Sequence, residues 1–94
     1  MAQRPLGIDV SHYQGSINWS SVAGAGITFA WNKATEGQSE VETTFANNEN
    51  NAKAAGIPIG PYHYAHPELN TPASEAAHFW NVAGAYIKGD ATCP

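Results

Sequence analysis

Three short apolar runs alternate along this sequence with segments of helical periodicity, and this alternation limits the possible fold more than any other feature. The pattern predicts strands near residues 6–10, 27–33 and 57–64 and helices near residues 19–25, 44–55 and 72–88. A β-α-β-α-β-α order requires crossover connections, which are right-handed and join parallel strands. The sequence therefore predicts one α/β domain over residues 1–94 with a three-stranded parallel sheet.

Local signals mark where the predicted helices begin and end. Asn18 is a suitable N-cap for the first helix, and Thr71, which precedes a proline, is suited to cap the third. Gly26, Gly56 and Gly89 follow the three helices, as expected at helix C-termini. Each predicted helix therefore has a defined end, and no linker or repeat interrupts the chain.

The same periodicity predicts which side chains form the core. Trp19, Phe79 and Trp80 lie on the apolar stripes of the helices, so we expect them to be buried. Helices covering one face of the sheet are expected to bury the aliphatic strand residues, namely Leu6, Ile8, Val10, Ile57 and Ile59. The polar stretch at residues 37–43 is expected to be a mobile loop.

Polar and aromatic residues follow each predicted strand. Asp9 precedes a Ser-His-Tyr-Gln segment, the second strand opens into Asn-Lys-Ala-Thr-Glu-Gly, and the third opens into Pro-Tyr-His-Tyr-Ala-His. A dinucleotide-binding unit would carry G-x-G-x-x-G after its first strand, and residues 7–15 do not match that motif. Eight-stranded β/α barrels gather reactive side chains at the carboxyl ends of their strands. The pattern favours part of such a barrel.

Charge and composition exclude several classes of partner. The formal net charge is −4 with only four lysine and arginine residues, which argues against electrostatic binding to nucleic acid or an anionic membrane. No run approaches the roughly 18 apolar residues of a membrane span, and the first residues show no apolar segment typical of a secretory signal, so the compartment is left undefined. Cys93 is the only cysteine, so no disulfide can form within the chain.

Five segments in this order span nearly the whole sequence: GIDVSHYQG, INW, ITFAWNKATEG, AKAAGIPIGPYHYAHP and EAAHFWNVAG. Together they resemble the N-terminal part of glycoside hydrolase family 25, the Chalaropsis-type lysozymes that cleave peptidoglycan. The resemblance implies a TIM-like (β/α)8 barrel and action on the β-1,4 bond between N-acetylmuramic acid and N-acetylglucosamine. It also implies peptidoglycan or a related glycan as partner, and neither a metal nor another cofactor.

The resemblance implies roles for four residues. Asp9 matches the active-site aspartate of the family's first strand, which positions the substrate and tunes a neighbouring acid. Tyr62 matches an aromatic residue that lines the saccharide groove. Lys33 and Glu36 match positions at the mouth of the second strand, where the lysine is expected to pair with carboxylates and support the shape of the site.

Two departures from the family pattern affect what this sequence can do. Trp31 and Asn32 stand where the family usually has aliphatic residues, which leaves the packing of the second strand open. The family's general acid lies in a D-x-E motif on the fourth strand, and this sequence is expected to be truncated before that strand. Hydrolysis generally needs a proton donor and a second carboxylate or a substrate group, and Asp9 cannot serve as both.

A three-unit partial barrel would leave the lumen face of its sheet and both outer strands uncovered. We expect that face to be apolar, and we expect a homo-oligomer or a complementing chain to cover it. Two functional hypotheses follow. The chain is either part of a lysozyme whose other half is supplied elsewhere, or a catalytically inactive half barrel that binds glycan or self-associates.

Simpler interpretations of the same residues remain open. Asp9 is also suited to a turn or a cap, Glu36 lies in an ordinary turn sequence, and Lys33 is equally suited to a structural ion pair. The histidines do not have the spacing that identifies a metal site; they are His12, His63, His66 and His78.

Overall fold

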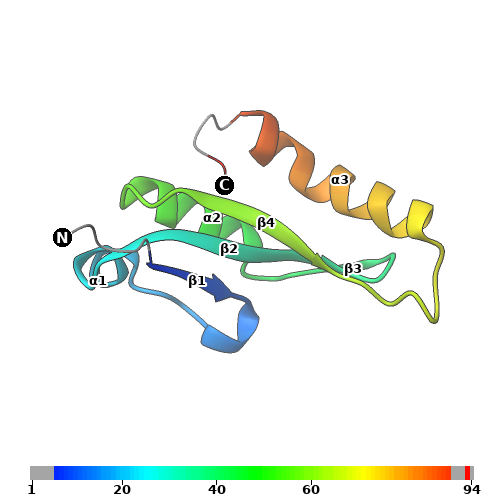
Figure 1. Cartoon of the computed structure of the whole chain (residues 1–94), viewed down its shortest axis with the longest axis horizontal. Coiled ribbons are helices and arrows are strands. Elements are labelled where there is room, and N and C mark those ends of the chain that lie inside the picture. The colour runs from blue at the N-terminus through cyan, green and yellow to red at the C-terminus, as the bar shows by residue number, and fades with distance from the viewer. Residues whose placement is uncertain (1–5, 90–92, 94) are drawn as a thin grey trace.

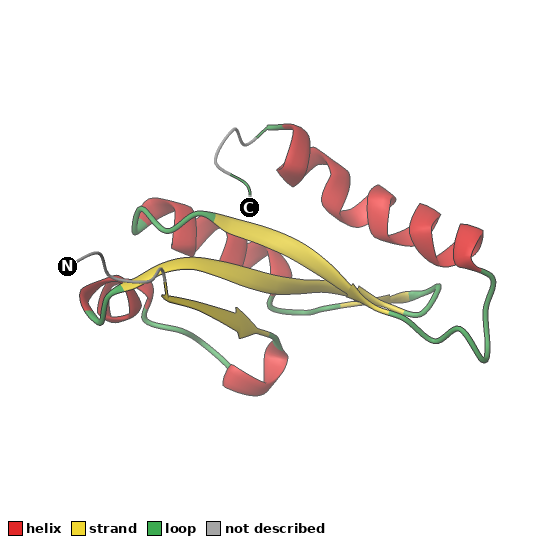
Figure 2. Ribbon diagram, viewed as in Figure 1, coloured by secondary structure: helices red, strands yellow, loops and turns green. Residues whose placement is uncertain are grey.

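The computed structural model describes residues 6–89 and 93, in which helices pack against a small mixed sheet (Figures 1 and 2). The strands are β1 (Leu6–Val10), β2 (Ile27–Glu36), β3 (Glu40–Val41) and β4 (Ile59–Tyr64). The helices are the 3-10 turn η1 (His12–Gln14), α1 (Trp19–Gly24), α2 (Phe45–Ala54) and α3 (Pro72–Lys88). The expected start of a further strand, after Gly89, falls mostly outside the described residues.

β2 is the central strand of the sheet. It pairs in parallel with β1 over its first part and with β4 over its second part, which confirms the predicted parallel arrangement. The end of β2 also pairs with β3 in antiparallel fashion, with Glu36 opposite Glu40. Glu36 pairs with Tyr64 of β4 across one edge of β2 and with Glu40 of β3 across the other edge. β3 therefore lies on the same edge of β2 as β1 (Figure 1).

β3 corrects the expectation that residues 37–43 form a mobile loop. The backbone N–H of Gly37 donates to the carbonyl oxygen of Tyr64 at 3.0 Å, and that of Glu42 donates to the carbonyl oxygen of Ala34 at 2.8 Å. These bonds fasten the segment to both neighbouring strands. A two-residue strand is too short to produce a periodic pattern, so β3 has no signature in the sequence.

The register divides the strand residues between two faces of the sheet. Residues paired across neighbouring strands project to the same face, so Asp9 shares a face with Trp31, and Lys33 shares it with Tyr62. The register shift that follows Lys33 keeps Glu36 on that face as well. The open face is defined here as Asp9, Trp31, Lys33, Glu36, Tyr62 and Tyr64.

The other face of the sheet packs against the helices and forms the core. One buried cluster joins β1, β2 and β4 to α1 and α2 through Val10, Trp19, Ala30, Ala52, Ile57 and Ile59. A second, smaller cluster joins β2, α2 and α3 through Ala34, Phe45 and Ala83. The predicted burial of Trp19 and of three of the five aliphatic strand residues is confirmed, while Ile8 and Phe79 are half-buried at the margins.

Two residues that we expected in the core are exposed. Leu6 begins an edge strand and keeps 56% of its surface accessible. Trp80 is 46% exposed, because its ring lies along its own helix close to Gly84, with the Lys88 ammonium 5.3 Å from the ring centroid. The apolar stripe of α3 is wider than the surface that the sheet offers, so the residue at its margin remains outside.

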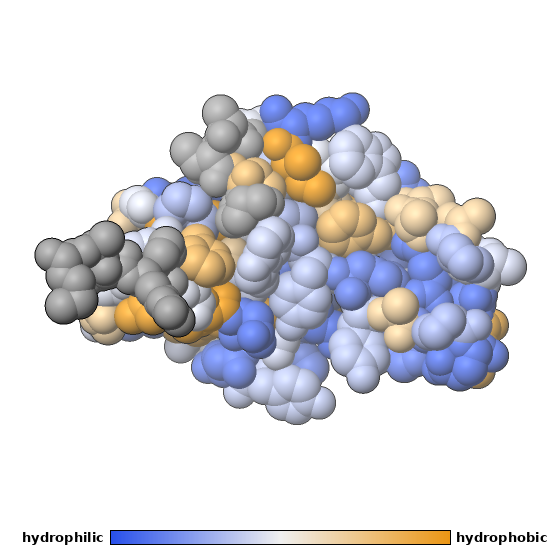
Figure 3. Space-filling view, viewed as in Figure 1, coloured by the Kyte–Doolittle hydropathy of each residue, from blue (hydrophilic) through white to orange (hydrophobic). Residues whose placement is uncertain are grey.

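The open face is aromatic and charged rather than aliphatic, which corrects the expected apolar patch. Side chains alternate along the strands, so the aliphatic residues face the helices and the open-face residues point to the other side. In Figure 1, β2 and β4 pass in front of α2, so the open face is the one nearer the viewer. The corresponding surface is largely pale and blue, with orange confined to its margins (Figure 3). This face is therefore suited to a polar ligand.

The helix caps agree with the sequence signals. Asn18 Oδ1 accepts the N–H of Ser21 at 3.1 Å, and Thr71 Oγ1 accepts the N–H of Ser74 at 3.2 Å. Gly26, just after α1, adopts a φ of 89°, a conformation that favours glycine. Over residues 6–89, none of the helices combines the length and apolarity needed to cross a bilayer.

Candidate functional site

Asp9 and Tyr62 lie on the open face near the carboxyl ends of β1 and β4. Asp9 is exposed, whereas Tyr62 is half-buried opposite Lys33. Burial, followed by the negative charge of Asp9, raises the pKa of the Tyr62 phenol above its ordinary value. The raised pKa favours the neutral form of the Tyr62 phenol, in which it can donate a hydrogen bond.

Lys33 connects two carboxylates at the centre of the site. Its ammonium pairs with Glu36 and lies 3.5 Å from Glu42 Oε2, and it sits 5.3 Å from the centroid of the Tyr64 ring. Burial acts to lower the pKa of Lys33, but the hydrogen bonds and charges of Glu36 and Glu42 outweigh it and raise that pKa. Lys33 is thus held as a cation between two carboxylates.

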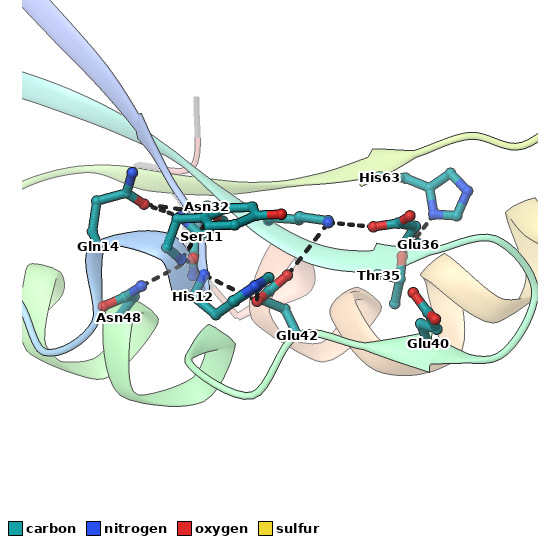
Figure 4. A network of polar contacts seen from close by, with 12 residues as sticks. Ser11, His12, Gln14, Asn32, Thr35, Glu36, Glu40, Glu42, Asn48 and His63 are labelled. Atoms are coloured by element: carbon teal, nitrogen blue, oxygen red, sulfur yellow. Dashed lines mark hydrogen bonds and ion pairs between the residues drawn. The ribbon is translucent and has the colours of Figure 1, made fainter.

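Glu42 joins the β1–α1 connection to the rest of the site. Its Oε1 accepts the backbone N–H of His12 at 2.9 Å and also contacts His12 Nδ1 (Figure 4). The Glu42 side chain is buried, although it carries a charge. Beside it opens a cleft of about 320 Å³ lined by His12, Lys33, Glu36 and residues 40–43.

Glu36 extends this network to the β4–α3 connection. Glu36 Oε2 lies 2.7 Å from His66 Nε2, and His66 Nδ1 lies 3.0 Å from Glu68 Oε1. Carboxylates lie on both sides of the ring, and hydrogen bonds with Glu36 and then Glu68 raise the pKa of His66. The contacts join three connections that follow strands, through a series of side chains in this order: His12, Glu42, Lys33, Glu36, His66 and Glu68.

A second polar group fixes the start of α3 against β4. Glu75 accepts a hydrogen bond from His63 Nε2 at 2.7 Å and another from the backbone N–H of His66 at 3.1 Å. Since an ionised carboxylate can only accept, His63 Nε2 carries the hydrogen of the first contact, and the other ring nitrogen, Nδ1, lies 2.8 Å from the hydroxyl oxygen of Thr35. Glu75 and Thr35 are both buried, and the group fastens the start of α3 to β4 beside a cleft of about 310 Å³ that His63 and Glu75 line.

Asn32 explains how β2 accommodates its unusual pair of residues. Its side-chain amide is completely buried and donates to the carbonyl oxygen of Phe45 at 3.0 Å and to Glu49 Oε2 at 3.2 Å. Trp31 points the other way, onto the open face, where it is 39% exposed. Hydrogen bonds to α2 thus offset the cost of burying the polar Asn32 side chain where the family usually has an aliphatic residue.

Comparison with known proteins decides the family. The model for glycosyl hydrolases family 25 matches residues 8–94. This chain belongs to glycosyl hydrolase family 25. Lysozyme M1 of Streptomyces globisporus is 47% identical over 88 residues, which cover 94% of this chain and 30% of that protein. The N,O-diacetylmuramidase of Chalaropsis sp is 36% identical over 91 residues, covering 94% of this chain and 43% of that protein.

Solved structures of family 25 proteins share the fold. The lysozyme from Streptomyces coelicolor superposes with a TM-score of 0.81 at 46% identity, covering 88% of this chain and 39% of that chain. The family 25 glycosyl hydrolase from Bacillus anthracis gives a TM-score of 0.81 at 31% identity, covering 85% and 36%. This chain therefore has the mixed α/β fold of the family and spans well under half the length of these relatives.

The sequence motifs marked part of this candidate site and missed the rest. The structure places Asp9, Lys33, Glu36 and Tyr62 on one face, but the ion pairs depend on Glu42, for which the sequence carried no motif. Glu75 had a signal that we did not use, because acidic residues are favoured in the first turn of a helix.

The histidines are divided among different carboxylate partners. His12 and His66 bind different carboxylates, and within residues 6–89 and 93 no three His, Cys, Asp or Glu side chains are placed to hold a metal ion.

The network predicts how the stability of this family 25 chain depends on pH. Hydrogen bonds with Lys33 and then His66 lower the pKa of Glu36, and Glu36 followed by Glu68 raises the pKa of His66. The contribution of Glu36 is therefore lost as the pH falls below its ordinary value of 4.5, and that of His66 is lost as the pH rises above its ordinary value of 6.5. We expect the free energy of unfolding to be greatest between these values.

Urea unfolding at a series of pH values tests this expectation, with His66→Gln as the matched variant. The variant removes the titrating ring but keeps an amide, so its stability should no longer decline between pH 6.5 and 8. A wild-type stability that rises steadily through that interval would contradict the assigned role of His66.

Proposed function

We propose that this chain supplies the first β/α units and one carboxylate of the active site of a peptidoglycan-hydrolysing lysozyme, built as part of a (β/α)8 barrel. The observation that carries the proposal is the open face, where Asp9 and Tyr62 lie beside the Lys33 network at the carboxyl ends of parallel strands. Enzymes with this architecture place their chemistry at that end. Lysozyme relatives matching over most of this chain support the same assignment.

The charges on the open face assign separate tasks to its carboxylates. Glu36 and Glu42 are held as ionised partners of Lys33. Asp9 is exposed and lies near a neutral phenol, so it is suited to contact a saccharide and to stabilise positive charge that develops at a sugar carbon. Glycoside cleavage also needs a proton donor to the leaving oxygen, which we assign to further polypeptide.

Further polypeptide of the same barrel is the partner that we propose for the open face and for the outer edges of the sheet. Within the described residues, β1 and β4 each pair only with β2, so their outer edges retain unpaired backbone groups. The superposed lysozyme from Streptomyces coelicolor contains more than twice the length that matches this chain. The competing arrangement is self-association of this chain through the same edges. Sedimentation with the remaining part of that lysozyme distinguishes the two arrangements, because the first predicts a complex of the two polypeptides and the second a complex of this chain with itself.

A second candidate function is glycan binding without hydrolysis. Trp31 and Tyr64 are exposed on the open face beside Tyr62, and flat aromatic rings together with convergent polar groups are typical of ligand sites. Binding requires no proton donor, so this function would operate with the described residues alone.

Co-sedimentation with insoluble peptidoglycan tests the part shared by both candidates. We expect Tyr62→Ala to weaken binding by about tenfold, equivalent to about 1.4 kcal/mol, because it removes an aromatic ring from the open face. Tyr62→Phe should retain most of the affinity. Trp80→Ala, at an exposed ring on α3, is the control and should bind as the wild type does. Equal binding by all four proteins would contradict the assignment of the open face.

A further inference from the structure

Glu75, in the first turn of α3, accepts several hydrogen bonds from β4 and from the connection that follows it. The residue is 5% exposed. Its Oε1 lies 2.7 Å from His63 Nε2, and Oε1 and Oε2 lie 3.1 and 3.2 Å from the backbone nitrogen of His66. Oε2 also accepts the side-chain amide of Asn70 at 3.1 Å. One buried carboxylate therefore joins β4 and residues 65–71 to α3.

The backbone of His66 is held on both sides of the residue. Its N–H donates to Glu75, and its carbonyl oxygen accepts the N–H of Leu69 at 3.0 Å and that of Asn70 at 3.2 Å. Pro67 follows directly, and its ring restricts the main chain at that point. Because the main chain is held in this way, only the side-chain torsions of His66 are left to place its ring.

The His66 ring connects this fixed backbone to the open face. His66 Nε2 lies 2.7 Å from Glu36 Oε2, and Glu36 pairs in turn with Lys33. Glu36 and Lys33 both belong to the open face, whereas Glu75 lies on α3 and is buried. Glu75 can therefore influence the open face through the position of His66.

We propose that Glu75 is a positioning residue for the open face, which holds the β4–α3 connection so that the His66 ring contacts Glu36. Groups in a binding site keep their geometry when neighbouring side chains lock them in place. A looser connection would let His66 move away from Glu36, and the Lys33–Glu36 pair would lose one restraint. The inference rests on the proposed function in one respect, namely that the open face contacts a glycan.

The pKa of His66 reports whether its ring is in place. Three carboxylates face this residue, from Glu36 on β2, Glu68 in the connection and Glu75 on α3. Removing any of them changes the charge near the ring, and such a change alone would shift the pKa. Asn70→Ala avoids this problem, because it removes one hydrogen bond to Glu75 and leaves every charge unchanged.

NMR titration of the histidine rings in this chain tests the proposal, with the His66 signal assigned by its loss in His66→Gln. We expect Asn70→Ala to lower the pKa of His66 by about 0.5, which is about a threefold weaker preference for the protonated ring. The control Asn81→Ala, at an exposed position of α3, should leave that pKa unchanged. In a Glu36→Gln background, Asn70→Ala should have little further effect, because the contact that it loosens is already absent.

Glu75 itself is tested by comparing two substitutions that both remove its charge. Glu75→Gln keeps an oxygen that can accept the N–H of His66, whereas Glu75→Leu keeps a similar size without any acceptor. The pKa of His66 should therefore be lower in Glu75→Leu than in Glu75→Gln. If Glu75→Leu does not fold, the comparison of Asn70→Ala with Asn81→Ala decides.

Co-sedimentation with peptidoglycan separates failure of this inference from failure of the proposed function. Asn70→Ala should bind about threefold more weakly than Asn81→Ala, as expected when a supporting contact is lost. If Asn70→Ala lowers the free energy of unfolding but leaves the pKa of His66 and the binding unchanged, Glu75 has a structural role alone and the inference is wrong. If the pKa changes as expected but the wild type binds no peptidoglycan, the proposed function fails and the placement of His66 by Glu75 stands.

Discussion

Replacing Lys33 by methionine is expected to lower the free energy of unfolding by about 3 kcal/mol, because it leaves two carboxylates without their shared cation. Lys33 is 9% exposed and the Glu42 side chain is buried, so water cannot replace the lost ammonium effectively. Methionine retains much of the aliphatic length of lysine, which limits the loss of packing. A domain of this size has little stability in reserve, so the variant should unfold at markedly lower urea concentration.

A double-mutant cycle separates charge from packing in that prediction. Adding Glu42→Gln to Lys33→Met removes one uncompensated carboxylate, so the double variant should be more stable than Lys33→Met alone. Glu40→Gln is the matched control for stability, since Glu40 is exposed and has no ion pair with Lys33. If Lys33→Met costs less than about 1 kcal/mol, as for a surface ion pair, then the network does not organise the site.

Replacing Asp9 by asparagine is expected to reduce the rate of hydrolysis at least about 100-fold. The rate is measured in a protein that joins this chain to the remaining part of the Streptomyces coelicolor lysozyme. A loss of this size is found for groups that act in the transition state. The change is isosteric and Asp9 is exposed, so the fold should be unaffected. The same substitution removes a charge that raises the pKa of Tyr62, so that pKa should fall.

Ultraviolet titration of the tyrosines and a reducing-end assay check the two expectations separately. Glu68→Gln removes an exposed carboxylate at the far end of the ion-pair network and should retain activity. A fall in the pKa of Tyr62 without a loss of rate would place Asp9 beside the site but outside the reaction.

The fold could be predicted where it depends on local signals. Caps such as Asn18 and Thr71, and the glycines after the helices, fix element ends through chemistry within a few residues. Strand β3 could not be predicted, because two residues carry no period and their pairing depends on where β2 ends. Trp80 misled the core prediction because periodicity defines a stripe but not how much of it the sheet covers.

The site could be predicted only in part for a related reason. Asp9 and Tyr62 stood at strand ends, where an α/β protein gathers its chemistry, and motifs marked both positions. Glu42 follows β3, and its contact with His12 joins residues 30 positions apart in sequence. Such a contact follows from the tertiary arrangement and leaves no local pattern. The contacts of Glu42 with Lys33 and His12 therefore became visible only in the structure.

The release of reducing ends from purified peptidoglycan tests the central claim most directly. It is measured for this chain alone and for this chain joined to the remaining part of the Streptomyces coelicolor lysozyme, with the segments in the order in which they occur in that enzyme. We predict no release by the chain alone and lysozyme activity in the joined protein. A joined protein that folds and binds peptidoglycan but releases no reducing ends would contradict the claim that this open face is part of a hydrolytic site.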